Sequence, residues 1–265
     1  MIHLLQKPLL GVPVNWSHPL ARGLVGCWLM NEGGGNKVSE FSGNNNTGTL
    51  YAHTAWAAGK FGSCLSFDGA DDYVRATLKG TSLTKLTVSF RVNPAQTEST
   101  QRGIFQWANQ LSAGSPFILV ARAVSSTNIR FHVDGSYRLN TSIPNAAWSY
   151  ISITLNQNNL WTFYVNGIAV GTYQDDSTHD SQANANFVYL GNGYNDYFNG
   201  SIDTLMIWNR DLSVSEIQWL YREPFAMFDR PSIGLLYVPP AGGQTILDYE
   251  RSHRGVARGV LVGVP

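Results

Sequence analysis

The sequence predicts an all-β protein, an antiparallel sandwich of two sheets with one short helix near the end of the sandwich. Three observations lead to this prediction. Short stretches rich in β-branched and aromatic residues recur along most of the chain. Turn-forming residues separate these stretches, and the chain contains 26 glycines. One stretch, residues 213–221, repeats its apolar residues with the period of a helix.

The expected strands are short and follow one another closely. They cover residues 24–30, 64–67, 73–75, 86–92, 103–107, 117–123, 128–133, 148–155, 160–165, 168–172, 187–190 and 202–208. The strands at 64–67 and 73–75 are expected to form a hairpin around the turn that starts at Asp68. Asn166 and Gly167 lie between two apolar runs and predict a second hairpin with a type I′ turn. The period-two alternation of 86–92 predicts a strand with one buried face.

The helix is predicted from its start signal and its apolar face. Ser213 is followed three residues later by Glu216, which is the pattern of a capping box. The apolar residues then recur at helical spacing on one side, namely Val214, Ile217, Leu220 and Tyr221. We therefore expect a short amphipathic helix directly after the last strand.

Four segments, in this order, resemble those of laminin-G-like, concanavalin-A-like jelly-roll domains. They are residues 23–33 (GLVGCWLMNEG), 67–74 (FDGADDYV), 161–170 (WTFYVNGIAV) and 200–221, where a strand ends in NRDLS before the helix. The resemblance implies a jelly-roll sandwich over residues 23–222. It leaves residues 1–22 as an N-terminal arm and 223–265 as a C-terminal arm. Because this fold carries many functions, the resemblance predicts architecture better than activity.

Composition excludes several classes of partner. Lysine plus arginine and aspartate plus glutamate each total 18, so net charge gives no reason to expect nucleic acid as a partner. Apolar stretches are too short for a membrane-spanning helix, and we expect no membrane insertion. The first 13 residues lack the basic and apolar regions of a signal peptide. We expect the chain on a virion or at an extracellular surface.

Both arms are rich in apolar residues and interrupted by prolines. The N-terminal arm holds Pro8, Pro13 and Pro19, which disfavour a regular helix or a central strand. Exposed apolar surface of this kind marks an interaction site. The sequence therefore predicts that the arms lie against other copies of the chain or against other proteins of a virion or surface assembly.

Cys27 and Cys64 both fall in expected strands. They are either two small buried hydrophobic residues or a disulfide between neighbouring strands, and the sequence leaves both alternatives open.

No catalytic residues are expected. A glycosidase on this fold needs two carboxylates facing one cleft, and the chain lacks the Glu-x-Asp-x-x-Glu pattern that the resembled hydrolases use. Zinc spacing, a nucleophile elbow and a phosphate-binding loop are also missing from the sequence. We therefore expect a protein that is not an enzyme.

The resemblance implies a structural calcium ion that Glu32 and Asp203 could share, because family members often hold one near the chain termini. Calcium prefers carboxylate and carbonyl oxygens from converging loops. The cluster at Asp68, Asp71 and Asp72 has two interpretations, a second calcium site or an Asx-type turn in which side chains cap backbone amides. The turn is the interpretation that we favour.

Two polar loops contain the residue types that bind sugars, which are aromatic rings, amides and carboxylates. The candidate ligand-binding residues are Asp175, Asp176, His179 and Asp180 in the first loop and Asn192, Tyr194 and Asn195 in the second. The alternative for both loops is an ordinary solvated rim of the sandwich.

These observations favour a non-enzymatic structural or adhesion protein, a virion component (capsid decoration or tail) or a component of a surface assembly. Its lectin-like jelly roll would bind glycans. One alternative is a soluble carbohydrate-binding module, and another is a glycoside hydrolase.

Overall fold

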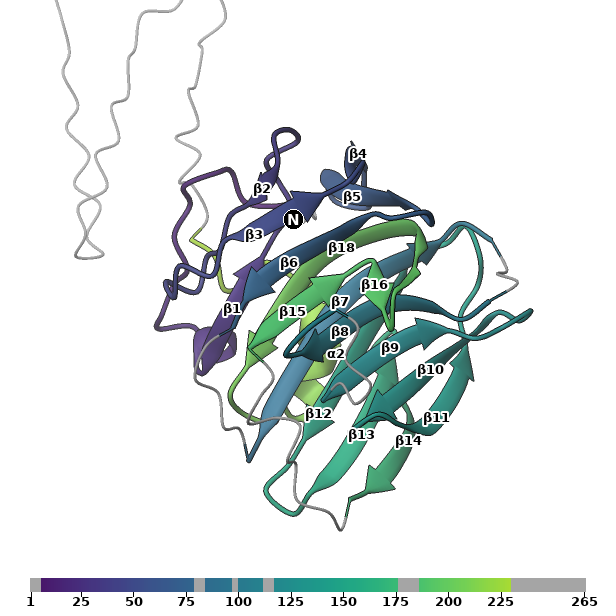
Figure 1. Cartoon of the computed structure of the whole chain (residues 1–265). Coiled ribbons are helices and arrows are strands. Elements are labelled where there is room, and N and C mark those ends of the chain that lie inside the picture. Colours follow the sequence, from purple (N-terminus) through teal and green to yellow (C-terminus); the bar gives the residue numbers. More distant parts are fainter. Residues whose placement is uncertain (1–5, 79–83, 97–99, 112–116, 176–185, 230–265) are drawn as a thin grey trace, which may run out of the picture. The chain divides into compact units, whose positions relative to one another are not determined.

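The structure is a computed structural model of the whole chain, and it describes residues 6–78, 84–96, 100–111, 117–175 and 186–229 (Figure 1). It divides the chain into two units, Met1–Asp229 and Arg230–Pro265. The second unit lies outside the described residues. The first unit is an antiparallel two-sheet sandwich with one α-helix, which confirms the predicted fold class.

One sheet has eight strands in the order β14-β13-β12-β7-β18-β5-β4, with β1 paired to β18. The strands are β1 (Leu24–Trp28), β4 (Ala55–Ala58), β5 (Ser63–Asp68), β7 (Leu86–Pro94), β12 (Ser149–Leu155), β13 (Leu160–Val165), β14 (Ile168–Gln174) and β18 (Asn199–Trp208). The turn between β13 and β14 has φ values of 51° at Asn166 and 78° at Gly167, as a type I′ turn requires. This predicted hairpin is confirmed.

The other sheet has ten strands, eight of them in the order β11-β10-β9-β8-β15-β6-β3-β2. These are β2 (Lys37–Val38), β3 (Gly48–Tyr51), β6 (Tyr73–Thr77), β8 (Arg102–Ala108), β9 (Ile118–Arg122), β10 (Asn128–Val133), β11 (Ser136–Ser142) and β15 (Phe187–Leu190). The short strands β16 (Asn192–Gly193) and β17 (Asp196–Tyr197) form a hairpin that joins this sheet through β17 and β8.

The main core lies between the two sheets and is largely aromatic. Trp107 of β8 packs edge-on against Phe117 with ring centroids 5.4 Å apart, and Phe117 packs against Trp161 of β13 at 5.7 Å. All three side chains are fully buried. Burial of large aromatic side chains is a main source of stability in a sandwich of this size.

A second core covers the outer face of the eight-stranded sheet. Its parts are the described N-terminal segment (residues 6–22), the helix α2 (Val214–Arg222) and the residues that follow α2. The N-terminal segment includes a short 3₁₀ helix, η1 (Pro19–Ala21). Leu20 is fully buried there, and its carbonyl accepts a hydrogen bond of 2.7 Å from Nε1 of Trp208.

The second core corrects our expectation for the arms. We expected both arms to lie on other chains, but Val14 and Leu20 of the N-terminal arm are buried against their own domain. Met227 and Phe228, at the start of the C-terminal arm, are buried in the same cluster, and Val14 forms a β-bridge with Phe228. The apolar character of these residues therefore comes from packing within the chain. The rest of the C-terminal arm lies outside the described residues.

The capping box of α2 is confirmed. The hydroxyl of Ser213 accepts a hydrogen bond from the backbone N–H of Glu216, and the Glu216 carboxylate accepts one from the backbone N–H of Ser213. Ile217 and Leu220 are buried, whereas Val214 and Tyr221 remain partly exposed. The buried stripe is thus narrower than the sequence predicted.

Two further expectations were wrong in detail. Strands β5 and β6 do not form a hairpin, because β5 belongs to the eight-stranded sheet and β6 to the ten-stranded sheet. The turn between them carries the chain across the sandwich. Strand β7 is buried on both faces, not one, because its outward-facing Thr87 and Arg91 hydrogen-bond to the backbone carbonyls of Arg210 and Tyr221, before and within α2.

Cys27 and Cys64 are free thiols and both are buried, which matches the first of the two alternatives. Within the described residues, no helix is long and apolar enough to cross a membrane.

Candidate functional site

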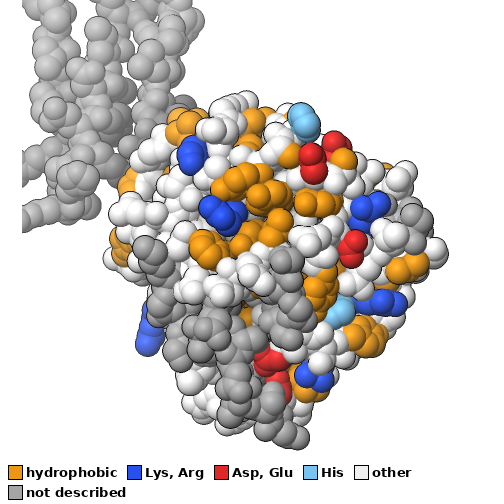
Figure 2. All heavy atoms as spheres, viewed as in Figure 1, with side chains coloured by type: hydrophobic (Ala, Val, Ile, Leu, Met, Phe, Trp, Pro, Cys, Tyr) orange, Lys and Arg blue, Asp and Glu red, His pale blue; other side chains and the backbone are white. Residues whose placement is uncertain are grey.

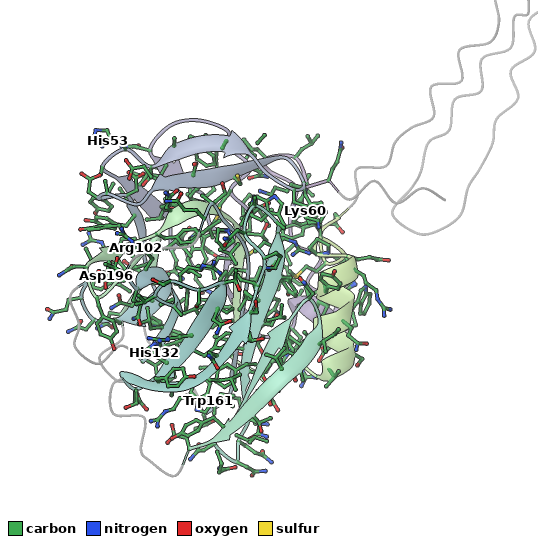
Figure 3. All side chains as sticks on the ribbon, turned by 90° about the vertical axis from the view of Figure 1, so that its right-hand side faces the viewer. His53, Lys60, Arg102, His132, Trp161 and Asp196 are labelled. Atoms are coloured by element: carbon green, nitrogen blue, oxygen red, sulfur yellow. The ribbon has the colours of Figure 1, made fainter. Side chains whose placement is uncertain are left out.

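The two outer faces of the sandwich differ in how they are covered. Helix α2 and the N-terminal segment cover the eight-stranded sheet, as described above. The outer face of the ten-stranded sheet, which we call the front face, points toward the viewer in Figure 1. His53, Asp196 and His132 lie on this side of the sandwich, opposite α2 (Figure 3). The front face is therefore the sheet surface that α2 and the N-terminal segment do not cover.

Strand registers place one outward-facing side chain from each of eight strands in a continuous row across the front face. The row follows from the Cα pairs of neighbouring strands, and it runs through Lys37, Thr49, Arg75, Tyr189, Gln106, Leu119, His132 and Tyr137. Alternate residues of the same strands point into the main core. Residues far apart in the sequence thus lie side by side on this face, although Gln106, Leu119, Tyr189 and His132 are buried.

Aromatic side chains surround the Arg75 end of this row, and we call this group the aromatic patch (Tyr51, Tyr73, Arg75, Phe187 and Tyr189). The rings of Tyr51 and Tyr73 are stacked, with centroids 4.5 Å apart and planes 5° from parallel. Tyr189 lies 6.4 Å from Tyr73 and 6.2 Å from Phe187. Figure 2 shows basic side chains among the hydrophobic side chains of the front face.

Arg75 is held by the rings on either side of it. Its guanidinium carbon lies 5.4 Å from the centroid of the Tyr51 ring and 5.2 Å from that of Phe187. Cation–π attraction at these distances orients the guanidinium. Burial raises the pKa of Tyr73 and of Tyr189, so both phenols keep their protons at neutral pH and can donate hydrogen bonds.

The β16–β17 hairpin crosses the middle of the row. A side chain at Gly103 would meet the backbone nitrogen of Gly193 at 1.9 Å, and a side chain at Gly193 would meet Leu119 at 2.3 Å. Only glycine permits this approach. Oε1 of Gln106 accepts a hydrogen bond of 3.3 Å from the backbone N–H of Tyr194. The hairpin therefore separates the aromatic patch from the other end of the row.

The other end of the row is built around His132. Its ring centroid lies 5.9 Å from that of Tyr137 and 6.4 Å from that of Tyr194. Burial, with a smaller effect of nearby Arg130, lowers the pKa of His132 to about 4. The imidazole is neutral at pH 7, so it offers one donor and one acceptor to a neighbouring group.

The structure places the sequence-predicted binding residues in two separate regions. Asn192, Tyr194 and Asn195 lie on or beside the hairpin that crosses the front face, next to the row. Asp175 follows β14 in the other sheet and is buried. Asp176, His179 and Asp180 lie outside the described residues. Of the two candidate loops, the second therefore belongs to the front face.

Asp203, one of the two expected calcium ligands, is paired with a lysine. The ammonium of Lys7 contacts Oδ1 of Asp203, and the two side chains are 4% and 0% exposed. The ammonium also donates to the carbonyls of Met30 and Ser63. Glu32 accepts a hydrogen bond from the backbone N–H of Ser39. Calcium binding by Glu32 and Asp203 stays a prediction, but Lys7 already supplies a positive charge at Asp203.

The expected Asx turn at Asp68 is confirmed. Its Oδ1 accepts a hydrogen bond of 2.8 Å from the N–H of Ala70, and the carboxylate of Asp72 accepts from the N–H groups of His53 and Asp68. Ligand atoms of His53, Asp71 and Asp72 lie within 4.8 Å of one another. This trio is the group among the described residues that could hold a metal, although backbone amides already occupy the Asp72 oxygens.

Comparison with known proteins assigns the family. The profile of laminin G family 3, of the concanavalin A-like lectin/glucanases superfamily, matches residues 68–218. The chain therefore belongs to this family. No curated protein has a sequence that matches the chain significantly.

Solved structures with the same fold include receptor-binding domains of toxins. The receptor-binding domain of botulinum neurotoxin D has a TM-score of 0.61 at 13% identity, over 78% of this chain and 54% of that chain. The binding domain of Paraclostridial Mosquitocidal Protein 1 has a TM-score of 0.62 at 17% identity, over 78% and 53%. Botulinum neurotoxin type C, which interacts with two ganglioside molecules, has a TM-score of 0.60 at 14% identity, over 77% and 51%. The chain thus spans about half the length of these proteins.

Proposed function

We propose that this chain is a non-catalytic binding domain whose front face binds glycans. The single observation that supports the proposal most is the aromatic patch on the sheet face that α2 and the N-terminal segment leave free. Sugars present flat C–H surfaces that stack on aromatic rings, and their hydroxyls pair with planar polar groups. The patch offers Tyr51 and Tyr73 as rings and Arg75 as a planar donor.

The fold neighbours support the same class of function. They are binding domains, and one of them belongs to a toxin that interacts with gangliosides. We place the domain at an extracellular surface or on a virion, where its front face would meet glycans of a host cell or a matrix. In this proposal the rest of the chain attaches the domain to its particle or surface.

The test is a glycan array followed by titration calorimetry with the best glycan. We expect wild type to bind and the double variant Tyr51→Ala/Tyr73→Ala to lose at least about tenfold in affinity, since tenfold corresponds to about 1.4 kcal/mol. Trp16→Ala is the matched control, because Trp16 is 56% exposed and belongs to the N-terminal segment, which packs on the other sheet. No binding to any glycan on the array, or an equal loss of affinity in the double variant and in Trp16→Ala, would contradict the proposal.

A second function, self-assembly, is supported by one observation. Leu9 and Leu10 of the N-terminal segment are 71% and 57% exposed, although residues further along the segment are buried. Adjacent exposed leucines favour contact with another apolar surface. We propose that they contribute to association with further copies or with other proteins of a virion or surface assembly. Light scattering should give an oligomer for wild type and a smaller species for Leu9→Ser/Leu10→Ser. A wild-type monomer would contradict this proposal.

A further inference from the structure

Arg75 is exposed and positively charged. Within the described residues, no acidic side chain forms an ion pair with it. Its partners in the structure are the Tyr51 and Phe187 rings. A ring face orients the guanidinium without accepting its hydrogen bonds as an anion does. The N–H groups of Arg75 are therefore available to a ligand.

A second cation lies beside Arg75. Strand registers pair Lys37 with Thr49 and Thr49 with Arg75, so the two basic residues flank one threonine. The ammonium of Lys37 donates a hydrogen bond of 2.8 Å to the hydroxyl of Thr49, and Lys37 is exposed. This end of the row thus carries two neighbouring positive charges on a chain whose net charge is +0.

Acidic residues at the nearby strand ends have partners of their own. A carboxylate oxygen of Asp71 lies 3.6 Å from Nδ1 of His53. Both oxygens of Asp72 accept backbone N–H groups, and Asp72 is buried. Among the described residues, neither these carboxylates nor any other acidic side chain forms an ion pair with Arg75 or Lys37.

We propose that the glycan bound by the aromatic patch is anionic, with a carboxylate or sulfate group held by Arg75 and supported by Lys37. This inference rests on the proposed glycan-binding function and names its substrate class. The planar guanidinium matches a carboxylate or sulfate with two parallel hydrogen bonds. The sugar ring that carries the anion then lies beside Arg75, against the aromatic side chains of the patch.

The experiment compares a matched pair of glycans, lactose and sialylated lactose, together with lactose carrying a sulfate in place of the sialic acid. Binding to wild type, Arg75→Gln, Arg75→Lys and Lys37→Gln is measured by calorimetry at low and at high salt. Lys60→Gln is the control, because Lys60 is an exposed lysine outside the front face. Figure 3 shows Lys60 apart from the front-face residues that it labels.

We expect wild type to prefer at least one anionic glycan over lactose by at least about tenfold, which is the range of one charge-assisted bidentate contact. Arg75→Gln should abolish this preference, Arg75→Lys should restore part of it, and Lys60→Gln should leave it unchanged. Higher salt should weaken anionic binding more than neutral binding. Equal binding of anionic and neutral glycans, or a preference that survives Arg75→Gln, overturns the inference but leaves glycan binding intact. Absence of binding to every glycan on the array contradicts the proposed function itself.

Discussion

Lys7 and Asp203 form a buried ion pair that connects the N-terminal segment to β18. Their side chains are 4% and 0% exposed. Burial lowers the pKa of Lys7 and raises the pKa of Asp203, while each partner's charge opposes the effect of burial on the other. The pair therefore anchors the start of the described N-terminal segment to the eight-stranded sheet.

The first prediction concerns Lys7→Met. Removing the ammonium leaves a carboxylate buried without its counter-charge, which costs about 3–5 kcal/mol of unfolding free energy. Denaturant unfolding at pH 7 measures the loss. The double variant Lys7→Met/Asp203→Leu should recover most of it, because it removes both charges. Lys60→Met, at an exposed lysine, should change stability by no more than about 0.5 kcal/mol.

The stability of the same variant should also depend on pH in a different way from that of wild type. Without Lys7 the pKa of Asp203 rises further, so the folded state binds a proton at a higher pH than the unfolded state does. Protonation then favours folding, and Lys7→Met should recover stability relative to wild type as the pH falls below 7. If the difference in unfolding free energy between Lys7→Met and wild type stays constant with pH, Asp203 is not an uncompensated carboxylate in the variant.

The second prediction concerns the crossing of the β16–β17 hairpin over β8. Gly103→Ala places a methyl group 1.9 Å from the backbone nitrogen of Gly193, so the hairpin must move. We expect Gly103→Ala to lower the unfolding free energy by about 1–3 kcal/mol. Glycan binding should also weaken, because the hairpin lies on the binding face. Gly34→Ala is the control, since a side chain there meets nothing within 4 Å and its backbone is unstrained. Equal stability of the two variants would contradict the close crossing.

The third prediction uses the lowered pKa of His132. Its pKa is about 4 in the folded state, against an ordinary value of 6.5. The unfolded chain therefore binds a proton first as the pH falls, and stability should drop between about pH 6.5 and pH 4, by on the order of 2 kcal/mol. Chemical denaturation across this range measures the slope.

His132→Gln should flatten this slope, because glutamine does not titrate. His53→Gln serves as the control, since the His53 side chain is 82% exposed. If NMR shows that the His132 ring itself titrates near pH 6.5 in the folded wild type, then His132 is not withdrawn from water.

The fourth prediction concerns the cap of α2. Ser213→Ala removes the hydroxyl that accepts the Glu216 N–H, and should lower the unfolding free energy by about 1 kcal/mol. Ser213→Asn, which keeps a capping side chain, should retain most of the stability. If thermal unfolding cannot distinguish Ser213→Ala from wild type, the capping box contributes nothing to the domain.

Features with a local signal could be predicted from the sequence. The capping box needs only Ser213 and Glu216, and the hairpin turn needs only Asn166 and Gly167, so each is encoded within a few residues. The two-sheet fold follows from the number and spacing of the strands. The prediction of a hairpin around Asp68 was wrong because turn residues indicate a reversal of the chain but not which sheet the next strand joins.

The aromatic patch has no comparable local pattern in the sequence. Tyr51, Arg75 and Tyr189 come from three strands whose pairing depends on the whole sheet, so their proximity appears only once the registers are known. The alternation around Arg75 could have shown which residues face outward, but not what lies beside them. Lys7 was missed for a similar reason, because nothing near it in the sequence indicates a partner on β18.

The most direct test of the account is NMR chemical-shift mapping with the tightest glycan found on the array. We predict that the largest shifts fall on the aromatic patch, in β3, β6 and β15, with smaller changes on the β16–β17 hairpin and none on α2. Shifts that cluster on α2 or on β12 and β13 instead, with the patch unchanged, would contradict binding by the front face.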